Sequence, residues 1–139
     1  MLTVGLADRF ERIVAVEGDP AAAGDLRANL AEAGQGRVEV LEQSVEAALP
    51  GLAGRSPVAL VLDPPRTGLV RGSAEALVAV RAERIVYLSC DPATLARDLA
   101  QICALGYRLA AVEGIDLFPQ TPHVEALATL ERSGTAHPG

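Results

Sequence analysis

A cysteine stands where a strand is expected to end and a helix to begin. The apolar residues 85–88 predict a buried strand, and Pro92 with the apolar stripe that follows it predicts an amphipathic helix. Cys90 would therefore lie at the carboxyl end of a strand, where ligands gather in open α/β sheets. The positive end of the helix favours a thiolate, and Asp91, as the N-cap, would oppose it. Cys90 is a candidate nucleophile, and the alternative is a small buried hydrophobic residue.

Two carboxylates follow expected strands in a similar way. Residues 13–16 predict a strand and residues 21–33 a helix, so Glu17 would lie within a βα unit. An acid at the tip of the second strand of a nucleotide-binding fold typically accepts hydrogen bonds from ribose hydroxyls. Residues 58–62 predict a central strand, buried on both faces, that leads to Asp63. On these patterns alone, Glu17 could instead be a solvated loop carboxylate and Asp63 part of a bare turn.

The loop that begins at Asp63 reads Asp-Pro-Pro-Arg-Thr-Gly and ends at Gly68. Two consecutive prolines fix the backbone and remove two amide donors, so the oxygens of this loop are free to accept hydrogen bonds from a ligand. Rigid acidic loops after a fourth strand are typical of methyltransferases that act on planar nitrogenous rings. Arg66 could hold a phosphate or pair with a carboxylate, and the sequence does not choose between the two.

A layered α/β fold must position these residues. Only 3% of the residues are aromatic, so the core must be built from Ala, Val, Leu and Ile. We expect an open, mostly parallel sheet with an antiparallel C-terminal edge strand. The other expected elements are a helical start at 1–12, a strand at 38–41, a helix at 44–49, a loop at 50–57, a helix at 73–82 capped by Ser73, and antiparallel strands at 107–117 and 123–130. The last pair would bring His123 and Glu125 to the mouth of its connecting loop.

Composition limits the class of protein. At 139 residues we expect a single domain over residues 1–132 and a disordered tail at 133–139. The net charge of −6 argues against a free-standing nucleic-acid-binding protein, which needs clustered positive charge.

Cys90 and Cys103 form neither a disulfide framework nor a metal site, and we expect Cys103 to be core packing. No apolar run reaches membrane length, and a cytoplasmic location is the expectation.

Three motifs, at residues 63–68, 87–99 and 116–125, closely resemble in order and spacing those of the RNA 5-methyluridine methyltransferases. These S-adenosylmethionine-dependent enzymes methylate C5 of uracil in tRNA and rRNA. The resemblance covers roughly residues 1–132. It implies that the sheet is a Rossmann-like methyltransferase sheet. It also implies S-adenosylmethionine as the cofactor and an RNA, not a membrane, as the partner.

The resemblance also implies a role for each site residue. Cys90 corresponds to the nucleophile that adds to C6 of uracil, and Glu125 to the base that takes the C5 proton. Glu17 and Asp63 correspond to acids of the cofactor site, with Glu17 toward the ribose. The resemblance assigns the role of base to Glu125 only, and His123 remains a secondary candidate. An amino-group methyltransferase is a further interpretation of the Asp-Pro-Pro loop, but Arg66 and Cys90 count against it.

The chain also departs from that family's pattern. Members carry, before the position of Met1, a strand and glycine-rich turn that hold the methionine part of the cofactor, and often a basic RNA-binding domain. Only residues 3–5 could be the tail of the first motif. We therefore expect a truncated catalytic domain that lacks the first, central strand, with the missing segment or RNA-binding module supplied elsewhere. The alternative is an inactive remnant or non-catalytic partner with a methyltransferase-like fold.

Overall fold

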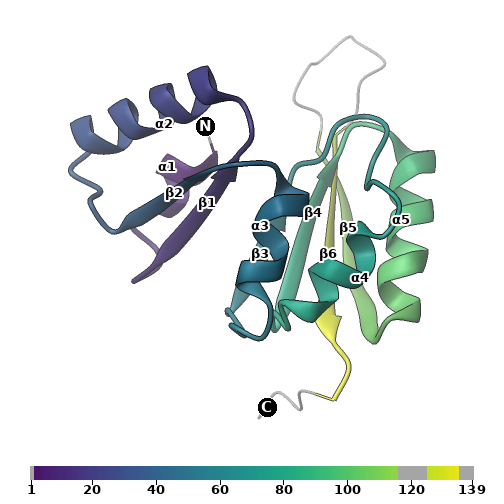
Figure 1. The fold of residues 1–139 in the computed structure, drawn as a ribbon. Coiled ribbons are helices and arrows are strands. Elements are labelled where there is room, and N and C mark those ends of the chain that lie inside the picture. Colours follow the sequence, from purple (N-terminus) through teal and green to yellow (C-terminus); the bar gives the residue numbers. More distant parts are fainter. Residues whose placement is uncertain (1, 116–124, 135–139) are drawn as a thin grey trace, which may run out of the picture. The chain divides into compact units, whose positions relative to one another are not determined.

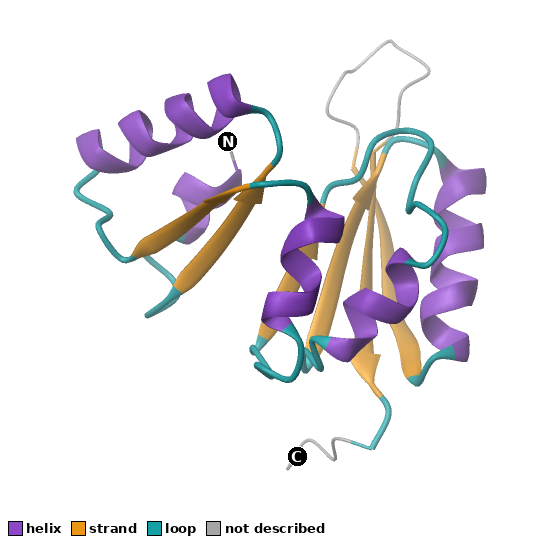
Figure 2. Cartoon of the chain, viewed as in Figure 1, coloured by secondary structure: helices purple, strands orange, loops and turns teal. Residues whose placement is uncertain are grey.

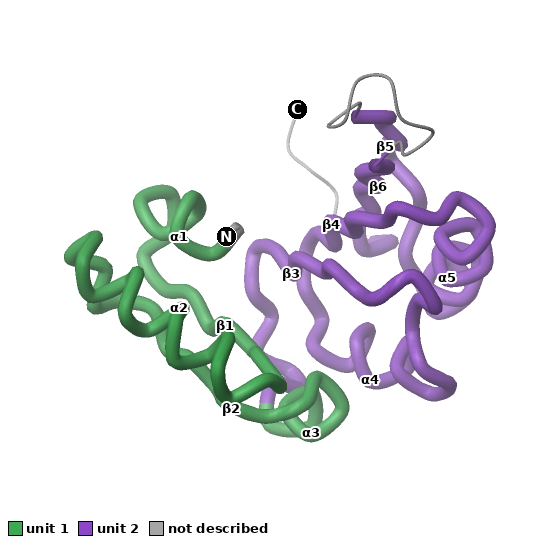
Figure 3. Tube along the Cα trace, turned by 90° about the horizontal axis from the view of Figure 1, so that it is seen from above, with its two compact units in different colours: residues 1–51 green, residues 52–139 purple. Residues whose placement is uncertain are grey.

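The computed structural model describes residues 2–115 and 125–134 of the chain. The chain divides into two compact units, residues 1–51 and residues 52–139, which are coloured separately in Figure 3. Each unit is described by itself. The expected single domain over residues 1–132 stays a prediction, as does the tail at 133–139.

The first unit is a small βα arrangement. It contains α1 (Leu2–Leu6), β1 (Ile13–Glu17), α2 (Pro20–Glu32) and β2 (Val38–Glu42). The two strands pair in parallel, from Ile13 opposite Val38 to Glu17 opposite Glu42. Helix α2 packs on both strands through buried residues that include Ala23 and Leu30. It begins where the Asp19 side chain accepts a hydrogen bond from the Ala22 amide at 2.8 Å, which satisfies one of the free amides of the first turn.

The second unit is built on a four-stranded sheet with the order β3-β4-β6-β5 (Figure 1). Its strands are β3 (Ala59–Leu62), β4 (Arg84–Ser89), β5 (Tyr107–Ile115) and β6 (Glu125–Arg132). The strands β3 and β4 pair in parallel, and β6 is antiparallel to both of its neighbours. The last strand is therefore antiparallel, as predicted, and it lies inside this sheet with β5 at the edge. The helices of this unit are α4 (Ser73–Ala79) and α5 (Pro92–Ala104), and α3 (Val45–Leu52) crosses the boundary between the units.

Alternation along β4 determines which residues form the core of the second unit. Ile85 and Tyr87 are fully buried, and their partners across the β4–β6 ladder, Leu130 and Ala128, are fully buried as well. Leu77 of α4 and Ile102 of α5 complete this core from the helices, which Figure 2 shows beside the strands. An apolar side chain at every second position of β4 and β6 thus fixes which face of the sheet the helices cover.

The described fold confirms the Rossmann-like class expected from the sequence, with two sheets in place of one. Within residues 2–115 and 125–134, β1 pairs only with β2, and β3 pairs only with β4. The same described residues contain no helix that is long and apolar enough to cross a membrane.

Three predicted elements were wrong in detail. The helix expected to stop at residue 49 continues as α3 to Leu52 and contains Pro50, although the sequence pattern predicts a loop from residue 50. Helix α4 ends at Ala79 and has Gly72 at its N-cap, because Ser73 is buried in the first turn and does not cap it. Strand β3 is half-buried at three of its four residues and not enclosed on both faces.

Candidate active site

A tight turn holds Cys90 between the end of β4 and the start of α5. The Ser89 hydroxyl accepts a hydrogen bond from the Asp91 amide at 3.1 Å and donates one to the Asp91 carbonyl at 3.0 Å. The Asp91 carboxylate caps α5 by accepting the Thr94 amide at 2.7 Å, as predicted. Cys90 is a half-buried free thiol. Since both of its neighbours are hydrogen-bonded, the backbone on either side of this thiol is fixed.

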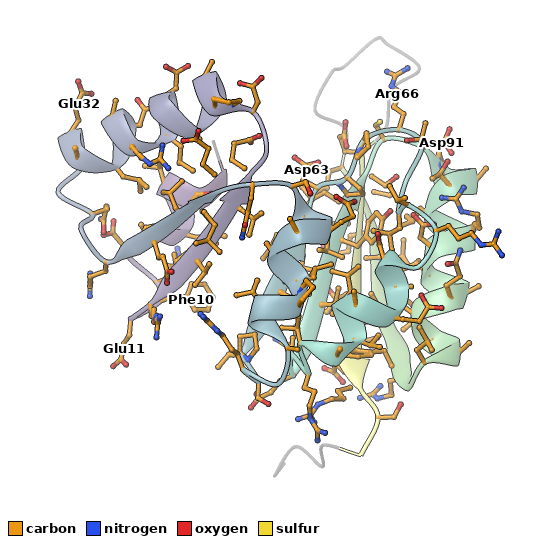
Figure 4. The ribbon with its side chains drawn as sticks, viewed as in Figure 1. Phe10, Glu11, Glu32, Asp63, Arg66 and Asp91 are labelled. Atoms are coloured by element: carbon orange, nitrogen blue, oxygen red, sulfur yellow. The ribbon has the colours of Figure 1, made fainter. Side chains whose placement is uncertain are left out.

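The pKa of the Asp91 carboxyl is lowered, chiefly by the hydrogen bond from the Thr94 amide. The positive charge of Arg66 contributes to the same shift. Arg66 therefore lies close enough to the Cys90 turn to interact with Asp91, and Figure 4 shows both side chains at one end of the four-stranded sheet.

The register of β4 and β6 brings the second predicted catalytic residue to the same end of the sheet. The ladder closes with Ser89 opposite Ala126. Cys90 follows Ser89, and Glu125 precedes Ala126, so the two residues lie at adjacent ends of neighbouring strands. Strands in a sheet are about 5 Å apart. Glu125 is half-buried and makes no side-chain hydrogen bond to another residue of the described ranges.

Asp63 also lies at this end of the sheet. Leu62, the last residue of β3, is opposite Tyr87 of β4, and Asp63 comes directly after it. Its side chain is exposed and, within the described part of the chain, has no hydrogen-bond partner. The structure therefore gathers Asp63, Cys90 and Glu125 at one end of the second unit's sheet. His123 lies outside the described residues.

Glu17 belongs to the first unit and ends β1. One carboxylate oxygen accepts a hydrogen bond from the Asp19 amide at 2.8 Å. Among the described residues the second oxygen has no partner, so it could accept a hydrogen bond from a ligand hydroxyl. Cys103 is half-buried on α5, and no group of described His, Cys, Asp or Glu side chains is arranged to hold a metal ion.

A buried carboxylate that the sequence reasoning missed joins the loop after β3 to the helix after Cys90. Asp98 of α5 is fully buried. Its Oδ2 accepts hydrogen bonds from the Tyr87 hydroxyl at 2.5 Å and from the Leu69 amide at 2.7 Å. Its Oδ1 accepts two from the Arg97 guanidinium, at 2.9 and 2.7 Å. The sequence did contain a signal, because Asp98 falls on the apolar stripe of α5 beside Leu95 and Leu99, where a charged residue needs buried partners.

Comparison with known proteins gives the family. The model of the tRNA (uracil-5-)-methyltransferase family matches residues 56–133, which is more than half of the chain. The chain belongs to this family. An RNA methyltransferase of Gloeobacter violaceus is 42% identical over 95% of the chain, and one of Streptomyces avermitilis is 41% identical over 91%. The chain spans 28% of the length of the first of these relatives and 29% of the length of the second.

Solved structures of methyltransferases share the fold. The tRNA (uracil-54, C5)-methyltransferase of Pyrococcus abyssi, in complex with S-adenosyl-L-homocysteine, matches with a TM-score of 0.78 and 29% identity. That match covers 91% of this chain and 30% of the other. An rRNA methylase from Streptococcus thermophilus matches at a TM-score of 0.66 and 17% identity, over 94% of this chain and 79% of the other, and shares the fold alone.

Gly68 provides a test of how closely the loop packs on Asp98. It is buried with φ of +73°, and a Cβ there would lie far inside van der Waals contact with the Asp98, Thr94 and Arg97 side chains. Gly54 has nearly the same φ, +71°, and open space around it. We expect Gly54→Ala to lower the free energy of unfolding by about 1 kcal/mol through backbone strain. Gly68→Ala should cost about 2 kcal/mol more because of the clash. Urea unfolding measures both, and equal losses would contradict the packing.

Proposed function

We propose that this chain is the catalytic part of an enzyme that transfers a methyl group from S-adenosylmethionine to C5 of uracil in tRNA or rRNA. The family match supports the reaction class. The observation that carries the residue assignment is the β4–β6 register, because it relates a free thiol to a carboxylate that has no hydrogen-bond partner among the described residues, at adjacent strand ends.

In the proposed reaction, Cys90 acts first. Uracil C5 is a poor nucleophile until a thiolate adds at C6, which forms an enzyme–C6 bond and leaves an enolate whose C5 is electron-rich. S-adenosylmethionine, when bound, supplies the methyl group that C5 accepts. The Glu125 carboxylate then removes the proton from C5, the C5–C6 double bond forms again, and the Cys90 sulfur leaves. A thiol and a base on neighbouring strands suit this sequence because the two must reach adjacent carbons of one ring.

The carboxylates at two strand ends fit the hydroxyl-rich cofactor. The free oxygen of Glu17 would accept a hydrogen bond from the ribose, and Asp63 would be a second acceptor. Neither carboxylate is held by an ion pair to another described residue, so both can accept from a ligand. The chain's net charge of −6 supports the view that affinity for RNA is local or comes from another module.

Cofactor binding tests the role of Glu17. We expect calorimetric titration of the chain with S-adenosylmethionine to give measurable binding, and Glu17→Gln to weaken the affinity about tenfold through loss of a charge-assisted hydrogen bond. Glu39→Gln is a suitable control because Glu39 is on β2 and pairs with Arg12. Its affinity should match the wild type. Absence of any binding heat would favour a non-catalytic remnant over the proposed enzyme.

Covalent trapping tests the nucleophile. RNA that contains 5-fluorouridine should form a stable adduct with the full-length protein, because fluorine cannot leave C5 as a proton would. Cys90→Ala should abolish the adduct, and Cys103→Ala, which removes the chain's other thiol, should keep it. Denaturing electrophoresis with labelled RNA detects the adduct. An adduct that survives in Cys90→Ala would show that another residue is the nucleophile.

The base assignment has a separate test. With ordinary substrate RNA, Glu125→Gln should form the covalent complex and then stall, because an amide cannot accept the C5 proton. Denaturing electrophoresis should show this complex accumulating while methylated RNA is not released. A Glu125→Gln variant that turns over at the wild-type rate would mean that another group takes the proton.

A further inference from the structure

The buried Asp98 joins three elements of the second unit that the proposed reaction uses. Through Leu69 it holds the loop that begins at Asp63, through Tyr87 it contacts β4, and it lies on α5, the helix that begins after Cys90. It is the only charged residue among the fully buried ones of the described ranges. A buried carboxylate is costly unless it is hydrogen-bonded, and here four donor contacts satisfy it.

A second tie links the same loop to the same helix. The Nη2 atom of Arg97 donates to Asp98 Oδ1 at 2.7 Å and to the Thr67 carbonyl at 2.9 Å. Within the loop, the Gly68 amide donates to the Pro65 carbonyl at 2.8 Å and closes a turn around Arg66. The loop is therefore held on both sides of Gly68, at Thr67 and at Leu69. Gly68 itself packs directly against the Asp98 and Arg97 side chains.

We propose that Asp98 is a positioning residue for methyl transfer, and that it holds the loop carrying Asp63 at a fixed place relative to the Cys90 turn. This inference rests on the proposed function. Asp98 would touch neither substrate nor cofactor. Asp98 acts through the hydrogen bond that it accepts from the Leu69 amide and, together with Arg97, through the Thr67 carbonyl. The hydrogen bond from the Tyr87 hydroxyl fixes the Asp98 carboxylate in place. Misplacement of reacting groups by about 1 Å can cost up to about 100-fold in rate, so such an anchor affects catalysis strongly.

The two tyrosines of the chain provide a matched comparison. Both hydroxyls are buried and hydrogen-bonded, Tyr87 to Asp98 at 2.5 Å and Tyr107 to the Ala82 carbonyl at 2.6 Å. Burial raises the pKa of both phenols, and the hydrogen bond to Asp98 raises that of Tyr87 further, so each hydroxyl remains a donor. Only Tyr87 is connected to the loop. Tyr107→Phe therefore reports the cost of losing a buried hydroxyl without any effect on the anchor.

The test measures methyl transfer to substrate RNA by the full-length protein carrying Asp98→Asn, Tyr87→Phe or Tyr107→Phe. All three should unfold at lower urea concentrations than the wild type. Well below those concentrations, kcat should fall about tenfold or more for Asp98→Asn and Tyr87→Phe, with KM for RNA changed by less than about twofold. Tyr107→Phe should keep the wild-type kcat. If kcat falls equally in all three variants, Asp98 has only a structural role and the proposal is wrong.

Hydrogen exchange separates this proposal from the proposed function. Exchange of the Leu69 amide should be faster in Asp98→Asn than in the wild type, and Tyr107→Phe should leave it unchanged. An unchanged Leu69 amide in Asp98→Asn would overturn the anchor whether or not the protein methylates RNA. If the wild-type protein transferred no methyl group but the Leu69 amide exchanged as expected, the proposed function would be refuted, and with it the role of Asp98 in catalysis. The hydrogen-bonded link between Asp98 and the loop would still hold.

Discussion

The pairing of β6 with β4 is the constraint on which the candidate site depends. Alternation along the two strands buries Ile85 and Tyr87 opposite Leu130 and Ala128. A slip of one residue would turn these apolar side chains to the other face, so burial fixes the register strongly. The same register determines which residue of β6 ends beside Cys90. Core packing therefore sets the relation between a thiol and a carboxylate that are 35 positions apart in the sequence.

Electrostatics adds a second level of order at the same end of the sheet. Parallel pairing of β3 and β4 brings two loops together, and backbone hydrogen bonds alone do not fix how those loops lie. Asp98 fixes how the loop after β3 lies, because a carboxylate removed from water accepts hydrogen bonds only in a restricted geometry. The partly exposed Arg97 stabilises the charge from the solvent side, with a side chain that is 51% accessible. The loop is thus held by a polar cluster, whereas the strands beneath it are held by apolar contacts.

Much of this arrangement could be predicted from the sequence, and the parts that could not have physical reasons. The strand at 85–88, the helix after Pro92 and the cap at Asp91 follow from local patterns, and all three were confirmed. The end of α3 was missed because proline usually stops a helix, yet Pro50 lies within this one. Burial of β3 was overestimated because an apolar run does not reveal how many neighbours a strand has. Asp98 was missed because its partners Leu69 and Tyr87 are 29 and 11 residues away.

The place of β6 inside its sheet has a consequence for how the protein is made. Residues 125–132 are the last strand of the described chain, and they lie between β4 and β5, which are both made earlier. Until a ribosome has released these residues, β5 has no ladder to join and the backbone N–H and C=O groups along one edge of β4 stay unpaired. A nascent chain therefore cannot assemble this sheet gradually from its beginning. It closes only after β6 has been made, through contacts between distant positions, which are the slowest to form.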